Sequence, residues 1–170
     1  AFHGGESRSV DEVLGTVAQL GSHHVCVTGG EPLAQPGCLS LLTRLCDAGH
    51  EVSLETSGAL DIAGVDRRVS RVLDLKTPGS GECERNLWEN IGQLTAHDQI
   101  KFVLCDRNDF EWAVDQIHQR RLDGICPIWF SPVWESLSPR DLADWIAAEQ
   151  PPVRMQLQLH KIIWGDEPGR

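Results

Sequence analysis

The sequence has 170 residues, 41 % of them hydrophobic, and a formal net charge of −10 from 25 acidic and 15 basic residues. This length and apolar content predict a single domain over residues 1–170 with a sizeable core. No Lys/Arg run exceeds two residues, so we expect neither a nucleic-acid partner nor an anionic membrane surface. No apolar run approaches the roughly 20 residues of a membrane helix, and no secretory-signal pattern is seen, which favours a cytoplasmic protein.

Six cysteines are spread along the chain at irregular spacings. They are Cys26, Cys38, Cys46, Cys83, Cys105 and Cys126. No pair has the C-x-x-C spacing of a zinc ribbon or a redox motif, so we expect reduced thiols rather than a disulfide framework. Cys26 and Cys105 fall in apolar, strand-like runs and are predicted to be small core residues.

Helical and strand-like patterns alternate along the whole chain. Helices are predicted over 10–20, from 39 to a stop at Gly49, and over 84–94, 108–119 and 139–149. Strands are predicted over 24–28, 51–56, 71–75, 99–104, 127–130 and 153–159. Ser9 with Glu12, and Asn108 with Glu111, have the spacing of capping boxes.

This alternation predicts an α/β fold with a mostly parallel sheet. Six strands are too few for a closed eight-stranded barrel, so we expect a partial (β/α) barrel. A dinucleotide-binding fold has no specific support, because no G-x-G-x-x-G turn is present.

One strand end stands out, because the apolar run 24–28 is followed by Gly29-Gly30-Glu31-Pro32. Glycines at a strand end permit positive φ and let a ligand approach the backbone. Glu31 adds a carboxylate that can hold an ammonium group. An ordinary Gly-Pro turn is the simpler alternative, but the preceding apolar strand and the acidic residue favour a binding site.

Polar residues recur where the other predicted strands end. The segments are Glu55-Thr56-Ser57-Gly58, Asp74-Leu75-Lys76, Ser131-Pro132-Val133-Trp134 and His160-Lys161. In barrel-type sheets these ends share one edge, where sites form, and a small polar cofactor requires such a convergence. Simpler explanations remain open: Glu55 and Ser57 as turn caps, Asp74 and Lys76 as a surface ion pair, and His160 as a core histidine.

The stretch Thr28-Gly29-Gly30-Glu31-Pro32 resembles the S-adenosylmethionine-binding strand end of the radical S-adenosylmethionine enzymes. Further segments resemble one family of that superfamily, the 7-carboxy-7-deazaguanine synthases of queuosine and deazapurine biosynthesis. These segments are Leu54–Gly58, Asp74–Lys76, Ile100–Val103 and Gln158–Lys161. Glu-Thr-Ser-Gly and the closing His-Lys distinguish the chain from glycyl-radical activating enzymes, which share the first motif.

The resemblance implies a reaction and a set of site residues. The family converts 6-carboxy-5,6,7,8-tetrahydropterin to 7-carboxy-7-deazaguanine with loss of ammonia, as a carbon–nitrogen lyase that uses S-adenosylmethionine, a [4Fe–4S] cluster and Mg²⁺. The implied cofactor-binding residues are Gly29, Gly30, Glu31, Glu55, Ser57, Asp74, Leu75, Lys76, Ser131, Pro132, Val133 and Trp134. Thr28 and His160 would bind the pterin, and no residue is assigned a catalytic role. A homodimer and an external one-electron donor such as flavodoxin are also implied.

Two features depart from the family pattern. The C-x-x-x-C-x-x-C cluster loop and the threonine that ligates Mg²⁺ are absent from these residues, and the family places them just before Ala1. We therefore expect that an N-terminal portion is missing, that Ala1–Glu6 is loop, and that this chain alone holds no cluster and is inactive. The tail Trp164–Arg170 is also longer than in some family members.

Two other functions are compatible with the sequence. A glycyl-radical activase would act on a protein partner, and a closed, substrate-sized pocket would count against it. A cluster-free module would bind S-adenosylmethionine or a pterin without chemistry, and the sequence upstream of Ala1 would distinguish it.

Overall fold

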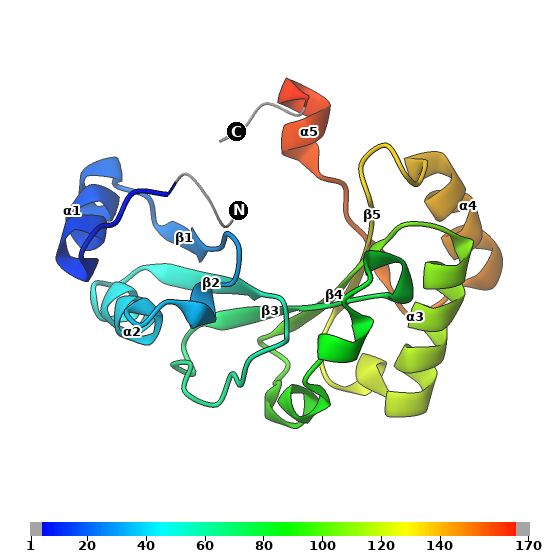
Figure 1. Cartoon of the computed structure of the whole chain (residues 1–170), viewed down its shortest axis with the longest axis horizontal. Helices are drawn as coiled ribbons and strands as arrows, with labels where there is room; N and C mark the ends of the chain where they lie inside the picture. Colours follow the sequence, from blue (N-terminus) through cyan, green and yellow to red (C-terminus); the bar gives the residue numbers. More distant parts are fainter. Residues whose placement is uncertain (1–4, 166–170) are drawn as a thin grey trace. The chain divides into compact units, whose positions relative to one another are not determined.

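A computed structural model describes residues 5–165, which form two compact units (Figure 1). Unit 1 contains the residues up to 74 together with 87–98, and unit 2 contains 75–86 and the residues from 99 onward. The predicted start of the N-terminal loop, Ala1–Gly4, and most of the predicted tail, Asp166–Arg170, lie outside the described residues. The assignment of 1–170 to a single domain stays a prediction.

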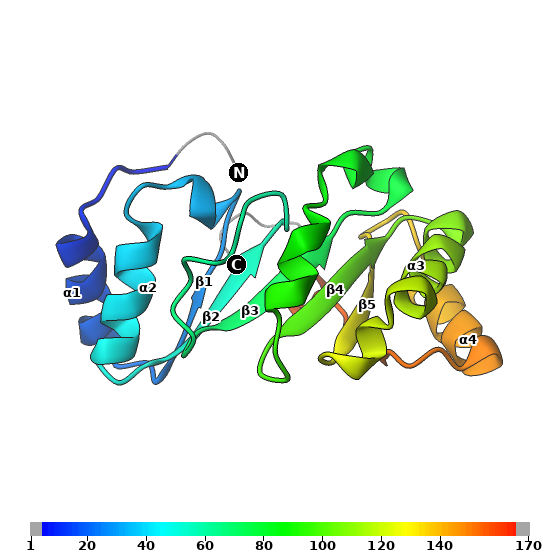
Figure 2. The ribbon, with the colours of Figure 1, turned by 90° about the horizontal axis from the view of Figure 1, so that it is seen from below.

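Unit 1 contains two helices and three parallel strands in the order β1–β2–β3. The elements are α1 (Val10–Leu20), β1 (His24–Val27), α2 (Cys38–Asp47), β2 (Glu51–Thr56) and β3 (Ser70–Leu75), whose last residue belongs to unit 2. The predicted capping box of Ser9 and Glu12 begins α1. Helices α1 and α2 lie side by side, and α2 packs on β2 (Figures 1 and 2).

Unit 2 repeats this arrangement with the parallel strands β4–β5–β6. Its elements are β4 (Gln99–Leu104), α3 (Arg107–Arg120), β5 (Ile128–Pro132), α4 (Pro139–Glu149), β6 (Arg154–Met155) and α5 (Leu159–Trp164). The ring of Phe130 lies 5.7 Å from Phe102 of β4 and 5.6 Å from Phe110 of α3, which joins strands and helix in one core. No helix among residues 5–165 is long and apolar enough to cross a bilayer.

The strands of both units alternate between a buried apolar face and a less buried polar face. In β2, Val52 and Leu54 are buried whereas Ser53 and Glu55 are not; in β4 the buried Phe102 follows the half-buried Lys101. Parallel sheets usually read as continuous apolar runs because both faces are covered. Polar residues on one face therefore indicate a surface kept for something other than core packing.

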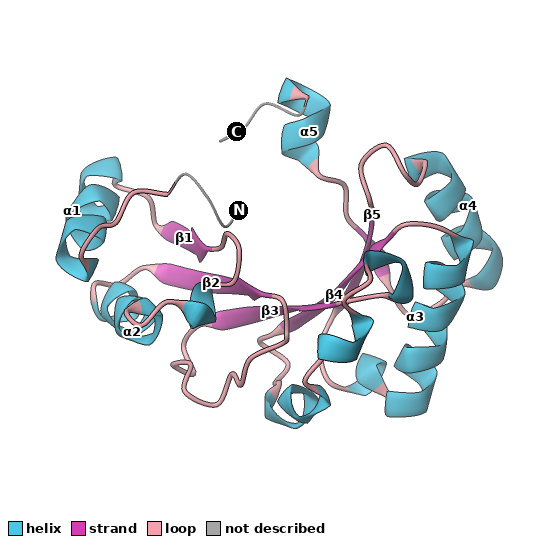
Figure 3. Ribbon diagram, in the orientation of Figure 1, coloured by secondary structure: helices cyan, strands magenta, loops and turns pink. Residues whose placement is uncertain are grey.

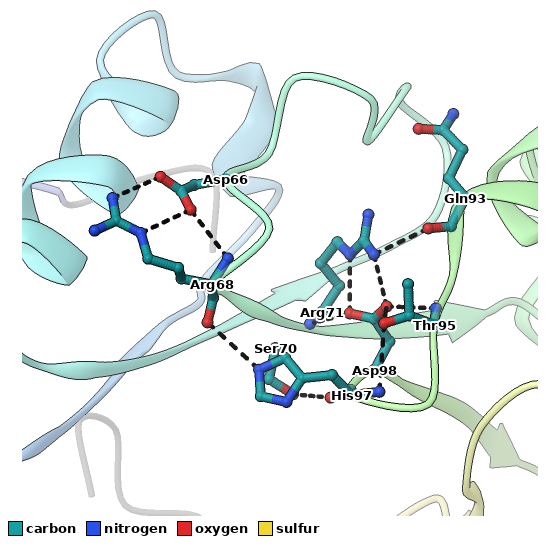
Figure 4. A network of polar contacts seen from close by, with 8 residues as sticks. All are labelled: Asp66, Arg68, Ser70, Arg71, Gln93, Thr95, His97 and Asp98. Carbon is teal, nitrogen blue, oxygen red and sulfur yellow. Dashed lines mark hydrogen bonds and ion pairs between the residues drawn. The ribbon is translucent and has the colours of Figure 1, made fainter.

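The amino-terminal end of β3 is held by a buried ion pair, shown in Figure 4. The Arg71 guanidinium donates from Nε to Oδ1 of Asp98 at 2.9 Å and from Nη2 to Oδ2 at 2.6 Å. The Asp98 carboxylate also accepts from Thr95, and Arg71 donates to the Gln93 carbonyl oxygen at 2.9 Å. This network fastens the segment 93–98 to β3 within unit 1.

The helix predicted over 84–94 is wrong. The region between β3 and β4 contains only short 3-10 turns, Pro78–Ser80, Cys83–Arg85 and Trp88–Gln93 (Figure 3). Asn90 explains part of the difference, because its buried amide binds three backbone groups of the segment 58–62. A polar residue committed to such tertiary hydrogen bonds anchors a loop rather than extending a helix.

Two element boundaries differ from the prediction. Asp106, not Asn108, caps α3, since its carboxylate accepts from the Asp109 amide at 3.0 Å. The last strand is the two-residue β6, and after it the Gln158 carbonyl oxygen accepts from Lys161 and Ile162 to begin α5. His160 and Lys161 therefore lie in a helix rather than at a strand end.

The cysteines are all free thiols. Cys26 is exposed and Cys105 is half-buried, so the prediction that both are core residues is wrong. Cys26 lies on β1 between the half-buried Val25 and Val27 and thus points to the less covered face. Burial, with the nearby Asp109 carboxylate, raises the pKa of the Cys105 thiol.

Candidate functional site

The end of β1 has the backbone conformation that its two glycines predict. Gly29 has φ 101° and Gly30 has φ 56°, positive values that residues other than glycine rarely adopt. A Cβ built on Gly29 would meet no atom within 4 Å, so open space lies beside the backbone here. This part of the chain can therefore be approached closely by a ligand.

Glu31 connects this turn to the end of β2. Its carboxylate accepts from the Leu33 amide at 3.1 Å, which caps the 3-10 turn Pro32–Ala34. The same carboxylate accepts from Thr56 Oγ1 at 2.9 Å, from the Ser57 amide at 2.8 Å and from Ser57 Oγ. Two predicted strand ends are thus brought together by one side chain.

These contacts use most of the acceptor capacity of Glu31, because a carboxylate offers about four lone-pair sites. All of its donors are neutral, however, and Glu31 forms no ion pair within residues 5–165. The half-buried carboxylate is therefore fixed in place while its negative charge is not matched by a cation. The carboxylate therefore still attracts an ammonium ion, although most of its lone pairs already accept hydrogen bonds from the protein.

Thr28 and Glu55 lie next to each other at the same strand ends. Thr28 Oγ1 donates to Glu55 Oε2 at 3.4 Å, a long and weak hydrogen bond. A cavity of about 570 Å³ within unit 1 is lined by Thr28, Gly29 and Pro32 together with residues of α1 and α2. Its walls thus include two of the residues that the sequence assigned to substrate and cofactor.

In unit 2, the last residue of β3 and the residue that follows it differ in accessibility. Leu75 is fully buried, and both backbone groups of Lys76 are bound by the side chain of Asn86. A ligand would therefore meet the Lys76 side chain rather than its backbone. Asp74, which precedes Leu75, occupies a half-buried position of unit 1.

The end of β5 borders a second cavity, of about 500 Å³. Its lining includes Pro132, Val133 and Trp134, three of the predicted cofactor residues. Gln158 lies in the same wall, and its Oε1 atom is buried without a hydrogen-bond partner among the described residues. Because a buried carbonyl oxygen without a donor is costly, this position suits a ligand that carries an N–H or O–H group.

Gln158 was missed as a site residue because nothing in its sequence context marks its Oε1 atom as buried. His160, two residues later, is exposed on α5, and Ser131 is buried in β5. No group of three or more His, Cys, Asp or Glu side chains among residues 5–165 could hold a metal ion. Residues 5–165 therefore do not fit a [4Fe–4S] cluster or a Mg²⁺ ion. No reaction step that depends on a cluster or on Mg²⁺ is assigned to these residues.

Curated proteins similar to this chain share one name. No protein-family model matches the chain. It is 41 % identical over 167 residues to a 7-carboxy-7-deazaguanine synthase from Chlorobaculum tepidum, covering 96 % of this chain and 76 % of that protein. Synthases of the same name from Koribacter versatilis and Thermoplasma acidophilum are 38 % and 34 % identical over 98 % and 99 % of the chain, and the chain covers 80 % of each. The chain belongs to the 7-carboxy-7-deazaguanine synthase family.

Solved structures confirm the fold of a family member. QueE from Escherichia coli superimposes with a TM-score of 0.68 at 21 % identity, over 89 % of this chain and 64 % of that one. Streptococcus suis SuiB bound to S-adenosylmethionine gives a TM-score of 0.60 at 14 % identity, over 89 % and 42 %. The predicted α/β fold of the radical S-adenosylmethionine type, with its parallel partial-barrel sheet, is confirmed.

Proposed function

We propose that this synthase-family chain carries out the ring contraction of 6-carboxy-5,6,7,8-tetrahydropterin to 7-carboxy-7-deazaguanine with loss of ammonia, as a carbon–nitrogen lyase in queuosine or deazapurine biosynthesis. The observation that carries the proposal is the Glu31 junction, where a bare glycine backbone and an unpaired negative charge meet two strand ends. The named relatives support this reading over a glycyl-radical activase or a cluster-free module.

S-adenosylmethionine is the cofactor that this junction suits. Its α-ammonium group matches the charge of Glu31, and the open backbone at Gly29, which Gly30 follows with φ 56°, leaves room for the methionine moiety. Once bound, the cofactor supplies the radical that removes a hydrogen atom from the substrate. Glu55, Ser57 and Asp74 complete the set proposed for unit 1.

Unit 2 contributes the second set of proposed cofactor contacts. The cavity beside Pro132, Val133 and Trp134 is mostly apolar and contains the unpaired Gln158 oxygen. A flat ring system with an exocyclic amino group would bury apolar surface there and satisfy that oxygen. Lys76, next to Leu75 and after Asp74, adds a cation for an oxygen of the cofactor, and Ser131 completes the set.

Thr28 and His160 are the residues proposed to contact the pterin. Thr28 lines the unit 1 cavity, and its hydroxyl donates a long hydrogen bond to Glu55. His160 is exposed on α5, so its imidazole is accessible to a ligand. Their role is binding and orientation, while the radical chemistry comes from the cofactor.

The remaining elements of the proposal are taken from the family. They are a cluster and Mg²⁺ held by the family's cluster loop, which this sequence does not contain, an external one-electron donor such as flavodoxin, a homodimer and a cytoplasmic location.

The test is direct. The chain joined to the C-x-x-x-C-x-x-C cluster loop of a known synthase, and supplied with cofactors, a reductant and 6-carboxy-5,6,7,8-tetrahydropterin, should yield 7-carboxy-7-deazaguanine by mass spectrometry. Binding of S-adenosylmethionine without that product, under conditions where a known synthase is active, would contradict the proposal. Formation of a glycyl radical on a protein partner would support the activase instead.

A further inference from the structure

The loop that follows β3 in unit 2 is held by two buried polar side chains that no sequence motif marks. The first is Asn86, which is 7 % exposed. Its Oδ1 accepts from the Lys76 amide at 2.9 Å, and its Nδ2 donates to the Lys76 carbonyl oxygen at 2.8 Å. One side-chain amide thus satisfies both backbone groups of Lys76, as a neighbouring strand would.

The second is Asp109, in the first turn of α3 and 1 % exposed. Its carboxylate accepts from Thr77 Oγ1 at 2.8 Å, from the Gly79 amide at 2.8 Å and from the Cys105 amide at 2.9 Å. Thr77 is itself fully buried. Asp109 therefore ties the loop after β3 to the end of β4.

Gly79 is required for this contact. A Cβ at position 79 would lie 2.6 Å from Oδ2 of Asp109 and 3.0 Å from Oδ1, which is closer than real Cβ atoms approach an oxygen. Only glycine lets the carboxylate reach the amide of residue 79. The loop 76–79 is consequently fixed at both ends by side chains from outside it.

We propose that Asn86 and Asp109 are positioning residues for S-adenosylmethionine: by fixing the backbone of residues 76–79 they set the direction of the Lys76 side chain toward the cofactor. This inference rests on the proposed function, in which Lys76 contacts the cofactor. The backbone of Lys76 is already committed to Asn86, so its side chain carries the interaction. A lysine side chain is long and flexible, so ordering it on binding costs conformational entropy. If its backbone were mobile as well, that cost would offset the binding energy of the ammonium group.

A double-mutant cycle separates positioning from stability. The substitutions are Asn86→Asp, which turns a donor into an acceptor facing the Lys76 carbonyl oxygen, and Asp109→Asn, which places an amide among three donors. Each is combined with Lys76→Met. The matched controls are Asn108→Asp and Asp115→Asn, both on exposed positions of α3.

The measurement is S-adenosylmethionine affinity by calorimetry on the full chain, with thermal unfolding and amide exchange at Lys76 recorded for each variant. We expect Asn86→Asp and Asp109→Asn to weaken binding on the order of tenfold, as the loss of one charge-assisted hydrogen bond from Lys76 would. In the Lys76→Met background the same substitutions should change affinity by less than about twofold. The controls should bind like the unaltered chain.

A purely structural role predicts equal losses in both backgrounds, and that result would overturn the inference. Unchanged affinity in folded Asn86→Asp and Asp109→Asn variants would overturn it as well. If either fails to fold, Thr77→Val removes a single donor to Asp109 with little change of shape and must show the same dependence on Lys76. Absence of binding to the unaltered chain would contradict the proposed function itself, whereas binding that is indifferent to Asn86 and Asp109 contradicts only the inference.

Discussion

Two carboxylates of unit 1, at opposite ends of its strands, accept similar numbers of hydrogen bonds from very different partners. Asp98, near the amino-terminal end of β3, is fully buried and faces the Arg71 guanidinium (Figure 4). Glu31, at the carboxyl end of β1, is half-buried, and among residues 5–165 its donors are Leu33, Thr56 and Ser57. The first charge is neutralised inside the protein, and the second is held in position without a counter-charge from the part of the chain that the structure describes.

This difference separates a structural site from a binding site. The charges of Arg71 and Asp98 neutralise each other, so removing one partner leaves the other buried and without a counter-charge. Glu31 has hydrogen-bond donors but no cationic partner among residues 5–165. A cationic ligand would therefore be attracted by a charge that the described part of the protein leaves unmatched. Substitutions at the Arg71–Asp98 pair should therefore change stability, whereas substitutions around Glu31 should change ligand affinity.

The largest effect is expected from Asp98→Asn. The substitution keeps the shape but leaves the Arg71 guanidinium, whose side chain is 8 % exposed, without its counter-charge. Breaking such a buried pair destabilises a protein by about 3–5 kcal/mol, measurable as the free energy of unfolding in urea. Asp11→Asn, which breaks an exposed pair with Arg44, is the control and should change stability little. A small loss for Asp98→Asn would show that the pair is not structural.

Acid should weaken the same site. Burial opposes ionisation of Asp98, but the hydrogen bonds from Arg71 and Thr95 outweigh it and hold its pKa below the ordinary value of 3.8. A carboxyl whose pKa is lower in the folded state stabilises the fold above its unfolded pKa, and this contribution is lost as the pH falls through the folded pKa. Unfolding experiments below about pH 4 should therefore show a steeper loss of stability in the unaltered chain than in Asp98→Asn. Parallel curves would contradict this assignment.

A smaller effect is expected at the other site from Ser57→Ala. This change removes one hydroxyl donor to Glu31 and leaves the Ser57 amide in place. Loss of one neutral hydrogen bond corresponds to about 1 kcal/mol, or roughly fivefold weaker S-adenosylmethionine binding. Ser53→Ala, within β2, which ends just before Ser57, is the matched control. Equal affinity of both variants would mean that Ser57 does not orient Glu31 for a ligand.

Much of the fold could be predicted from local sequence signals. The helix at 10–20 was predicted with its boundaries, because its capping box and terminal glycine act within a few residues. The strand over 51–56 was predicted equally well from its composition. The region 84–94 could not be predicted, since Asn90 forms hydrogen bonds with residues about thirty positions away. The length of the last strand was also predicted wrongly. The predicted strand covered residues 153–159, whereas β6 pairs with its neighbour for only two residues before α5 begins.

The candidate site was predictable where a motif coincides with a strand end, as at Gly29, Gly30 and Glu31. The partners of Glu31 were predictable only as neighbours at the same edge, not as its hydrogen-bond donors. Asn86, Asp109 and Gln158 were out of reach, because their roles arise from contacts or burial that tertiary packing creates.

The central claim is that the charge of Glu31, not only its hydrogen bonds, serves S-adenosylmethionine. The most direct test is calorimetric affinity for S-adenosylmethionine in the full chain and in Glu31→Gln, which keeps the shape and an acceptor oxygen but removes the charge. Glu51→Gln, at the amino-terminal end of β2, is the control, and circular dichroism verifies the fold. A charge-assisted bond contributes about 1.5–3 kcal/mol, so we predict binding about ten- to a hundredfold weaker for Glu31→Gln and unchanged for Glu51→Gln. Equal affinity in equally folded proteins would make Glu31 a turn residue and contradict the account.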